Sequence, residues 1–404
     1  MNFLIINELF SFGGAEIYVQ NLANILISNG HSVTRLFLRK KNGVSLPNNC
    51  YFIDCDSKLG KLFEKKRLTK IIRAFIKRNA PDIIVLNNIF SSPFSVYKAC
   101  FGYTTIKIIH DYQFVCPKST CITNDGNICS GFEKKKCEQS CLKAKNIKRD
   151  LLNLLRIKAF SKKKKYFSRY ITSFISPSNK LAQLAKAQGF QNIAVINNPI
   201  FIKNPKDSDF VSFEQKKNFI YVGLISEEKG IYQLIEAYKK SSPALNNSLL
   251  IFGRCATQDD NRKIVSLTQK SCKIKYMGQV DNIKVKKEIA KSLAIIVPSK
   301  WCENYPTTVL EGMAMKTLVI GTDRGGISEM LADGKGFIYD QTKLNDLQDL
   351  LRYVESIDKE SYQAITNKAY RYTMSNNSFE TYYDRFIFVC KKSLENPKNV
   401  IKVG

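Results

Sequence analysis

Short apolar runs alternate with amphipathic segments along the 404-residue chain. Strand-like runs in the first half lie at 2–7, 31–38, 82–88, 105–111 and 170–178. Those in the second half lie at 218–225, 248–253, 273–280, 293–299 and 317–322. Between them, residues 15–29 and 230–240 have the spacing of amphipathic helices. Mostly apolar strands with intervening helices are typical of parallel sheets covered on both faces, so the pattern predicts an α/β protein.

Because this order occurs twice, we expect two Rossmann-like, doubly wound domains. The polar stretch 198–216 contains two prolines and precedes a fresh strand at Phe219. We therefore place the N-terminal domain at 1–197 and the C-terminal domain at 198–376. The final segment, 377–404, begins with a helical pattern and follows no new strand, so we expect it to cross back onto the first domain.

The net charge of +28 is concentrated in the first half of the chain. Residues 1–200 carry 32 Lys and Arg against 11 Asp and Glu, whereas residues 201–404 carry 31 against 24. A positive field of this kind suits nucleic acid, anionic lipid or phosphorylated substrates. General lysine enrichment is the alternative, although the second half is nearly balanced.

The segment 143–174 combines this charge with apolar side chains, among them Leu151, Leu155 and Phe160. Such a mixture is typical of a helix that lies on an anionic membrane surface. A domain helix with a snorkelling polar face and an RNA-binding patch are the alternatives. No run reaches the ~20 apolar residues that a membrane span requires, and the N-terminus lacks the cationic start of a signal peptide. We expect a cytoplasmic location.

Five of the twelve cysteines fall close together, at Cys116, Cys121, Cys129, Cys137 and Cys141. Zinc takes four thiolate ligands, and the spacing of Cys137 and Cys141 is usual for a zinc clip. The set Cys116, Cys129, Cys137 and Cys141 is therefore a candidate for structural Zn²⁺. A thiol-rich loop without metal is the alternative, and a reducing cytoplasm argues against a disulfide framework.

Two positions in the first half have the character of a ligand site. Gly13 and Gly14 separate a strand from a helix, where glycines let backbone N–H groups approach an anion; a tight structural turn is the alternative. His110 ends a strand, the edge at which open α/β sheets bind ligands; a core or turn histidine is the alternative. Asp111 either orients His110 or caps the next segment. His31, in a turn, is interpreted as a packing residue.

In the second half, Lys229 lies at the start of a helix after a strand, where a cation and free N–H groups can neutralise a diphosphate; an exposed surface lysine is the alternative. Arg254 follows the next strand. Residues 298–312 contain Glu303 and Glu311, separated by seven residues, together with the only tryptophan, Trp301. Trp301 is interpreted as loop packing.

Together these pieces resemble the family 4 glycosyltransferases, which have the GT-B fold. The matching stretches are FGGAE at 12–16, NGHSV at 29–33, HDYQFVCP at 110–117, GLISEEKG at 223–230 and the region 298–331. The most specific is the E-x7-E pair, Glu303 and Glu311, followed by a glycine turn at Gly325–Gly326. The cysteine run resembles a subset that acts in surface-polysaccharide assembly.

The resemblance implies a role for each matching residue. Glu311 would bind the ribose hydroxyls of a sugar nucleotide, Glu303 the hydroxyls of the donor sugar, and Lys229 the diphosphate. His110 would contact the sugar near the reacting carbon, and Gly13 and Gly14 would let diphosphate and acceptor meet. The backbone N–H groups of one loop would contact sugar or diphosphate: Asn304, Tyr305, Pro306, Thr307 and Thr308.

The resemblance also implies a retaining, metal-independent hexosyltransferase that needs no cofactor. Its partners would be a nucleotide sugar and a lipid-linked or other glycan. From the composition of 143–174, we expect this segment to contact the anionic inner face of the cytoplasmic membrane, and we expect no nucleic-acid partner. One departure is Leu224, which replaces the arginine usual in the family; Arg254 or Arg324 would have to compensate. Two alternatives are a nucleic-acid-binding α/β protein and a non-catalytic glycosyltransferase-like partner subunit.

Overall fold

The computed structural model describes residues 1–10, 14–39, 47–53, 63–89, 93–142, 147–200, 205 and 207–395. The chain divides into two compact units. Unit 1 contains Met1–Asn124, Cys129–Ile196 and the C-terminal segment from Phe379. Unit 2 contains Asp125–Ile128 and Asn197–Ser378. The division after Ile196 lies one residue before the predicted boundary, and the segment that begins with Phe379 belongs to unit 1.

Unit 1 is built on a seven-stranded parallel sheet of order β3-β2-β1-β4-β5-β6-β7. Its strands are β1 (Asn2–Leu9), β2 (Ser32–Arg39), β3 (Cys50–Phe52), β4 (Ile83–Leu86), β5 (Thr105–Ile108), β6 (Ser173–Ser176) and β7 (Ile193–Val195). Its α-helices are α1 (Gly14–Ser28), α2 (Phe63–Asn79), α3 (Pro93–Ala99), α4 (Lys134–Lys136), α5 (Ile147–Tyr170), α6 (Asn179–Ala187) and α14 (Phe379–Glu395). The interior strand β1 is mostly apolar and buried on both faces, as is typical of parallel sheets.

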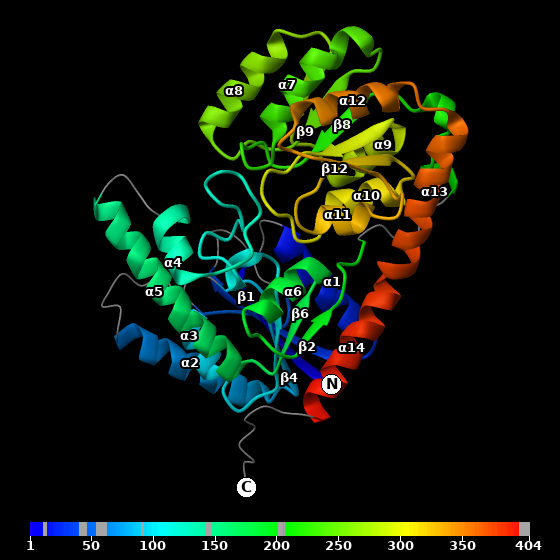
Figure 1. Cartoon of the computed structure of the whole chain (residues 1–404). Coiled ribbons are helices and arrows are strands. Elements are labelled where there is room, and N and C mark those ends of the chain that lie inside the picture. The colour runs from blue at the N-terminus through cyan, green and yellow to red at the C-terminus, as the bar shows by residue number, and fades with distance from the viewer. Residues whose placement is uncertain are drawn as a thin grey trace. The chain divides into compact units, whose positions relative to one another are not determined.

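Unit 2 has a six-stranded parallel sheet of order β10-β9-β8-β11-β12-β13. Its strands are β8 (Phe219–Val222), β9 (Leu249–Phe252), β10 (Ile274–Gly278), β11 (Ala294–Val297), β12 (Leu318–Thr322) and β13 (Phe337–Tyr339). Its α-helices are α7 (Ile231–Ser241), α8 (Gln258–Gln269), α9 (Asn282–Lys291), α10 (Thr307–Ala314), α11 (Gly326–Leu331), α12 (Leu344–Glu355) and α13 (Lys359–Asn376). Figure 1 shows these helices around the sheet of unit 2.

Successive side chains of the unit 2 strands enter two separate cores, because side chains alternate between the faces of a sheet. Phe219 and Tyr221 of β8 pack with helices α7, α8 and α12 on one face. Ile220, between them, packs with α9, α10 and α11 on the other. This arrangement is the doubly wound layout that the sequence predicts, and it leaves the loops at the carboxyl edge of the sheet to form the site.

The C-terminal helix α14 packs against α1 within unit 1 (Figure 1). The Tyr18 and Tyr382 side chains meet edge to face with ring centroids 5.9 Å apart, and their hydroxyl groups hydrogen-bond. His31 Nε2 lies 2.9 Å from the Tyr383 hydroxyl oxygen, and its Nδ1 lies 3.2 Å from the N-terminal amine. His31 is therefore a packing residue, as predicted.

All ten predicted strand runs contain a strand, and the predicted fold class is confirmed. The sequence missed β3, β7 and β13, which have three residues each and lie at the edges of their sheets. Helices α1 and α7 begin and end within one residue of the predicted ranges. None of the helices in the described part of the chain is both long and apolar enough to cross a membrane.

Candidate functional site

In unit 2, the loop after β8 ends at Gly230, which caps helix α7 with φ of 73°. A Cβ atom at this position would lie 1.8 Å from the Pro298 carbonyl oxygen. Glycine is therefore required on two counts, since φ is positive and the backbone of the loop after β11 passes directly against it. This close approach brings Lys229, at the end of one loop, to Glu303 in the other.

One oxygen of Glu303 accepts three hydrogen bonds from neighbouring side chains. Lys229 Nζ and Ser299 Oγ each lie 2.6 Å from Glu303 Oε1. Trp301 Nε1 donates to the same oxygen at 2.8 Å, and Lys229 Nζ lies 4.6 Å from the centroid of the Trp301 ring. Trp301 packs within the loop, as expected, and its indole N–H also orients Glu303 while its ring contacts Lys229.

These contacts fix the charge of the Glu303 side chain. Burial favours the neutral acid, but the Lys229 ammonium and the hydrogen bonds from Ser299 and Trp301 outweigh it and hold the pKa of Glu303 below its usual value. Glu303 is therefore a carboxylate at neutral pH, and its position is set before any ligand arrives. The backbone is also held: Gly326 N–H donates to the Glu303 carbonyl oxygen at 2.7 Å.

Glu311 lies in a different environment, about one turn into helix α10. Burial raises the pKa of Glu311 to about 7, while nearby Lys286 acts in the opposite direction. Within the described residues, no hydrogen bond or ion pair to its carboxyl group is present. A half-buried carboxyl group of this kind has acceptor capacity available for the hydroxyl groups of a ligand.

Residues 304–308 lead into α10, which has Pro306 as its N-cap. Thr307 and Thr308 open the helix, so their N–H groups have no intrahelical acceptor. Pro306 has no N–H group, so the prediction that it donates one was wrong. Tyr305 is buried, with its hydroxyl accepting from Asn377 Nδ2 at 3.3 Å, and Asn304 is 8% exposed.

Arg254 is an exposed residue at the carboxyl end of β9, in the loop beside the one that carries Lys229. Ile225 N–H donates to the Arg254 carbonyl oxygen at 2.9 Å, which ties the two loops together. Leu224, which replaces the expected arginine, accepts a hydrogen bond at its carbonyl from the Tyr221 hydroxyl at 2.7 Å. Arg254 therefore remains a candidate for the second cation.

Arg324 is the weaker candidate because its guanidinium is buried and occupied. Its Nε donates to Gln341 Oε1 at 3.1 Å and its Nη1 donates to the Gly126 carbonyl oxygen at 2.9 Å. A ligand would have to displace these bonds to reach it. Arg324 instead anchors the turn that begins α11, next to the glycine whose N–H holds Glu303.

In unit 1, a buried amide pair positions His110. Asn7, Asn87 and His110 lie at the carboxyl ends of the neighbouring strands β1, β4 and β5. Asn87 Nδ2 donates to Asn7 Oδ1 at 2.9 Å, and Asn87 Oδ1 bonds to His110 Nε2. Because both asparagines are fully buried, the imidazole has one defined orientation. The sequence did not indicate this pair, since asparagine after a strand is ordinary turn chemistry.

Burial, reinforced by the nearby charge of Lys107, lowers the pKa of His110 to about 3. The neutral ring carries its proton on Nε2, because the Asn87 oxygen that faces it is an acceptor. Nδ1 is then the acceptor atom, so this imidazole would receive a hydrogen bond from a hydroxyl through Nδ1. Asp111 does not orient His110; its carboxylate caps the next turn by accepting from Gln113 N–H at 2.9 Å.

Gly13 lies outside the described residues, and Gly14 is the first residue of α1. The predicted anion contact of this turn therefore stays a prediction.

The four candidate zinc ligands lie near one another, because burial and the charges of Cys116, Cys141 and Cys129 all raise the pKa of Cys137. A side-chain hydrogen bond with Cys121 lowers the pKa of both Cys116 and Cys129 to about 6. Among the described residues, no group of three or more His, Cys, Asp or Glu side chains is arranged to hold a metal ion. Structural zinc stays a prediction.

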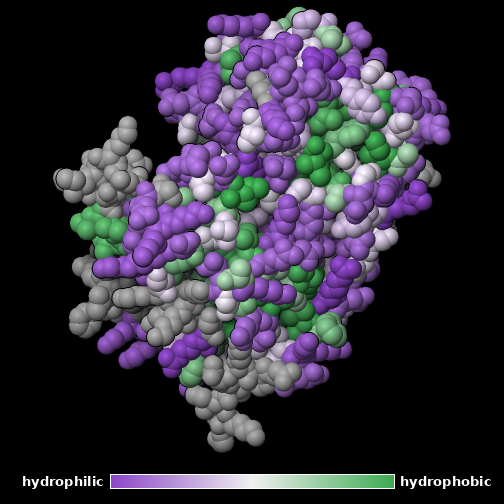
Figure 2. Space-filling view, viewed as in Figure 1, coloured by the Kyte–Doolittle hydropathy of each residue, from purple (hydrophilic) through white to green (hydrophobic). Residues whose placement is uncertain are grey.

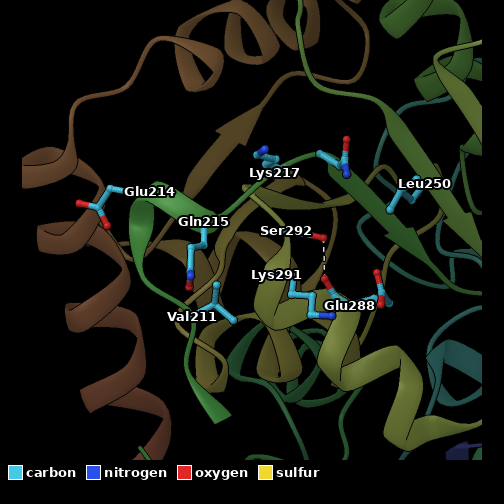
Figure 3. A pocket seen from close by; sticks show the side chains of 9 residues that line it. Val211, Glu214, Gln215, Lys217, Leu250, Glu288, Lys291 and Ser292 are labelled. Carbon is cyan, nitrogen blue, oxygen red and sulfur yellow. Dashed lines mark hydrogen bonds between the residues drawn. The ribbon is translucent and has the colours of Figure 1, made fainter. Parts of the chain in front are cut away.

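A cavity of about 550 Å³ lies at the opposite edge of the unit 2 sheet (Figure 3). Lys217 and Asn218 directly precede β8, and Ser292 precedes β11, so the cavity is at the amino ends of these strands. Glu288 and Lys291, from the end of α9, complete one wall. None of the predicted site residues lines it, so the cavity is separate from the Glu303 loop.

The match to a family model covers much of unit 2: residues 203–372 fit the glycosyl transferases group 1. An uncharacterized glycosyltransferase of Methanocaldococcus jannaschii is 26% identical over 220 residues, which is 54% of this chain and 58% of that protein. A 42.6 kDa protein of the cps region of Klebsiella pneumoniae is 23% identical over 363 residues, 82% of this chain and 87% of that one.

The fold of the whole chain matches solved glycosyltransferase structures. Anabaena Alr3699/HepE in complex with UDP-glucose superposes with a TM-score of 0.72, covering 97% of this chain and 100% of that one at 14% identity. Residues 203–372 therefore resemble the group 1 glycosyltransferases, and the likeness to solved structures shows the GT-B fold.

Proposed function

We propose that this chain transfers a hexosyl group from a nucleotide sugar to a lipid-linked glycan, with retention of anomeric configuration and without a metal. The observation that carries the proposal is the difference between the two glutamates of unit 2. Glu303 is an oriented carboxylate held by Lys229, whereas the Glu311 carboxyl has no hydrogen bond or ion pair with any described side chain. Glu303 is already oriented to bind one group of a ligand, and the carboxyl of Glu311 is available to bind a second group.

The proposed roles follow from these environments. Glu311 binds a vicinal diol, as a ribose offers, because its carboxyl oxygens have open acceptor positions. Glu303 accepts hydrogen bonds from donor-sugar hydroxyls, and Lys229 neutralises the charge that develops on the departing diphosphate. The N–H groups of Thr307 and Thr308 at the start of α10 add partial positive charge. The sugar contact of His110 stays a prediction of the family resemblance.

The glycan acceptor is supported by the relatives. One of them comes from a cps region, whereas Alr3699/HepE, solved with UDP-glucose, supports the nucleotide-sugar donor. Assembly of a surface polysaccharide would bring the enzyme to a lipid-linked acceptor on the inner face of the cytoplasmic membrane. The peripheral, cytoplasmic location belongs to the same proposal.

Helix α5 supports membrane contact because it is apolar on two opposite faces. Ile157 and Phe167 are buried against unit 1. The other face exposes four leucines, with exposed Arg156 and Lys158 beside them: Leu151 60%, Leu152 64%, Leu154 43% and Leu155 54%. Figure 2 shows the resulting hydrophobic patch over α5. Leucines flanked by cations match a surface of acyl chains and anionic headgroups.

The membrane proposal is tested by sedimentation with vesicles. We expect binding to phosphatidylglycerol vesicles that weakens with salt, and at least about tenfold weaker binding when Leu151 and Leu155 are both changed to Ser. Ile283, 70% exposed on α9 of unit 2, offers the matched control Ile283→Ser. Equal binding to neutral phosphatidylcholine vesicles, or no effect of the double substitution, would contradict it.

The transferase proposal is tested by a thermal-shift panel of nucleotide sugars. A ligand that binds only the folded state raises the melting temperature by mass action, so the panel ranks base and sugar together. We expect one nucleotide base to be preferred and its stabilisation to be reduced in Glu311→Ala. Stabilisation by nucleic acid without any response to nucleotide sugars would oppose the proposal.

A further inference from the structure

Tyr18 of α1 packs against His110 in unit 1. The two rings meet edge to face, with centroids 4.8 Å apart and an interplanar angle of 75°. Tyr18 is 4% exposed, so the contact is shielded from water. The hydrogen bond to Asn87 holds Nε2 of His110, but χ2 of a histidine has a broad energy minimum, and rotation about it swings Nδ1. The packed ring of Tyr18 restricts that rotation and so helps to set the direction of Nδ1.

The side chain of Tyr18 is in turn held by Tyr382 of the C-terminal helix α14. Their hydroxyl groups hydrogen-bond, although the residues are 364 positions apart. Both side chains are buried, and a buried hydroxyl group that loses its partner destabilises the fold, so each hydroxyl keeps the other in place. Tyr382 stacks on Phe386, one turn later in α14, with ring centroids 6.0 Å apart, and Phe386 packs against Phe3 of β1. Tyr382 is therefore anchored in the core of unit 1.

We propose that Tyr18 and Tyr382 are positioning residues for His110, a role that rests on the proposed function, in which His110 contacts the donor sugar. Tyr382 holds Tyr18, and Tyr18 limits the rotation of the imidazole. Nδ1 then points in one direction, from which it accepts a hydrogen bond from a sugar hydroxyl. Because the rate falls steeply when a reacting group is misplaced, a small rotation of the imidazole is enough to slow the transfer. Helix α14 thereby contributes to the reaction as well as to the packing of unit 1.

Tyr383, the next residue of α14, provides a matched control. Its hydroxyl oxygen lies 2.9 Å from Nε2 of His31, the packing residue that follows α1. Helix α14 thus reaches both histidines of the chain, His31 through Tyr383 and His110 through Tyr382 and Tyr18. Tyr382→Phe and Tyr383→Phe each remove one hydroxyl group that hydrogen-bonds a side chain. A general loss of packing would therefore appear in both variants, whereas a loss of positioning would appear only in Tyr382→Phe.

The first measurement is the NMR spectrum of the ligand-free full chain with isotope-labelled histidine rings, assigned with His31→Gln. The resonances of each imidazole report how the neighbouring aromatic ring lies against it. We expect Tyr382→Phe to shift the resonances of His110 and to leave those of His31 in place. We expect Tyr383→Phe to do the reverse.

The second measurement is the steady-state release of nucleoside diphosphate from the nucleotide sugar that stabilises the protein most. We expect kcat to fall at least about tenfold in Tyr382→Phe, with KM for the donor changed less than about twofold. In Tyr383→Phe, we expect both constants to stay within about twofold of the wild type. If Tyr382→Phe fails to fold, Tyr18→Phe breaks the same hydrogen bond from the side of α1.

Unmoved His110 resonances in Tyr382→Phe, or equal losses of kcat in the two variants of α14, would overturn the positioning role. Shifted His110 resonances with an unchanged kcat would also overturn it, because the orientation of the imidazole would then not matter to the transfer. A wild-type chain that turns over no nucleotide sugar would contradict the proposed function, and the role of the pair would fall with it. The spectra distinguish that failure from a failure of the ring contact, since they need no substrate.

Discussion

Lys229 Nζ lies 2.6 Å from Glu303 Oε1, although the two residues are 74 positions apart and belong to different loops of unit 2. Both side chains are largely shielded, with exposed fractions of 24% and 13%. The ion pair is therefore well ordered, and the indole N–H of Trp301 and the hydroxyl of Ser299 restrict it further. Cation and carboxylate are held together at the point where the loops after neighbouring strands meet.

Replacing Lys229 should affect both the charge and the position of Glu303. In Lys229→Met, burial is no longer opposed by the ammonium, so the pKa of Glu303 rises and the acid limb of the rate profile moves to higher pH. We expect kcat to fall about 100-fold or more, the effect of removing one stabilising group from a developing anion. Steady-state kinetics over pH, with Lys300→Met as control, measure this, since Lys300 pairs with Glu227 instead. An equal fall in kcat in Lys229→Met and Lys300→Met would refute the role assigned to Lys229.

Glu311→Gln should stabilise the empty protein while weakening ligand binding. The pKa of Glu311 is raised to about 7, so the folded state binds a proton more tightly than the unfolded state, and stability falls as pH rises from about 4.5 to 7. The glutamine removes this penalty. We expect a melting temperature about 2–4 °C higher at pH 8 and no difference near pH 4, with nucleotide binding at least about tenfold weaker. Equal melting curves at pH 8 would contradict the environment inferred for Glu311.

His110 should not titrate in the physiological range. Its pKa, lowered to about 3, means that the folded state prefers the neutral ring, so this contribution to stability is complete above pH 6.5 and is lost as pH falls toward 3. Asn87→Asp places a carboxylate beside Nε2 and should raise the pKa of His110 by at least about one unit. The histidine resonances in NMR spectra over pH measure this. Asn87→Ala adds no charge, so we expect no such rise in the pKa of His110. A rise of equal size in Asn87→Ala would show that the carboxylate beside Nε2 is not its cause.

Gly230→Ala should destabilise unit 2 more than the same substitution at Gly278, a glycine with a similar φ. Gly230 has φ of 73° and faces the Pro298 carbonyl, whereas Gly278 has φ of 69° and no atom within 4 Å of the position that a Cβ would take. Positive φ alone costs about 1 kcal/mol, and a clash adds to it. We expect Gly278→Ala to lower the unfolding free energy by about 1 kcal/mol and Gly230→Ala by at least about 3 kcal/mol. Similar denaturation midpoints for the two variants would argue against the tight loop contact.

Strands buried on both faces could be predicted from the sequence because their apolar runs are continuous, as in β1 and β11. The edge strands β3 and β7 could not, since three partly buried residues are too few to distinguish a strand from the surrounding loop. Among the site residues, Lys229 and the spacing of Glu303 and Glu311 could be predicted from the sequence. The convergence of Ser299 and Trp301 on Glu303 Oε1 could not be predicted, because it depends on how the loop folds.

The buried pair Asn7–Asn87 was equally invisible in the sequence, since its two members lie on separate strands that become neighbours only in the sheet. The zinc site cannot be settled from the sequence either, and it stays a prediction. Cysteine spacing is a property of the chain, whereas zinc ligation requires the sulfurs to converge as thiolates, and no such group is arranged among the described residues.

The most direct test is release of nucleoside diphosphate from nucleotide sugars by the purified chain, compared with Glu303→Gln and with Glu228→Gln. Glu228 is an exposed carboxylate next to Lys229 and so controls for charge near the site. The proposed mechanism predicts slow release from at least one donor without acceptor, unchanged in Glu228→Gln and reduced about 100-fold or more in Glu303→Gln. Release that is equal in wild type and Glu303→Gln would contradict it.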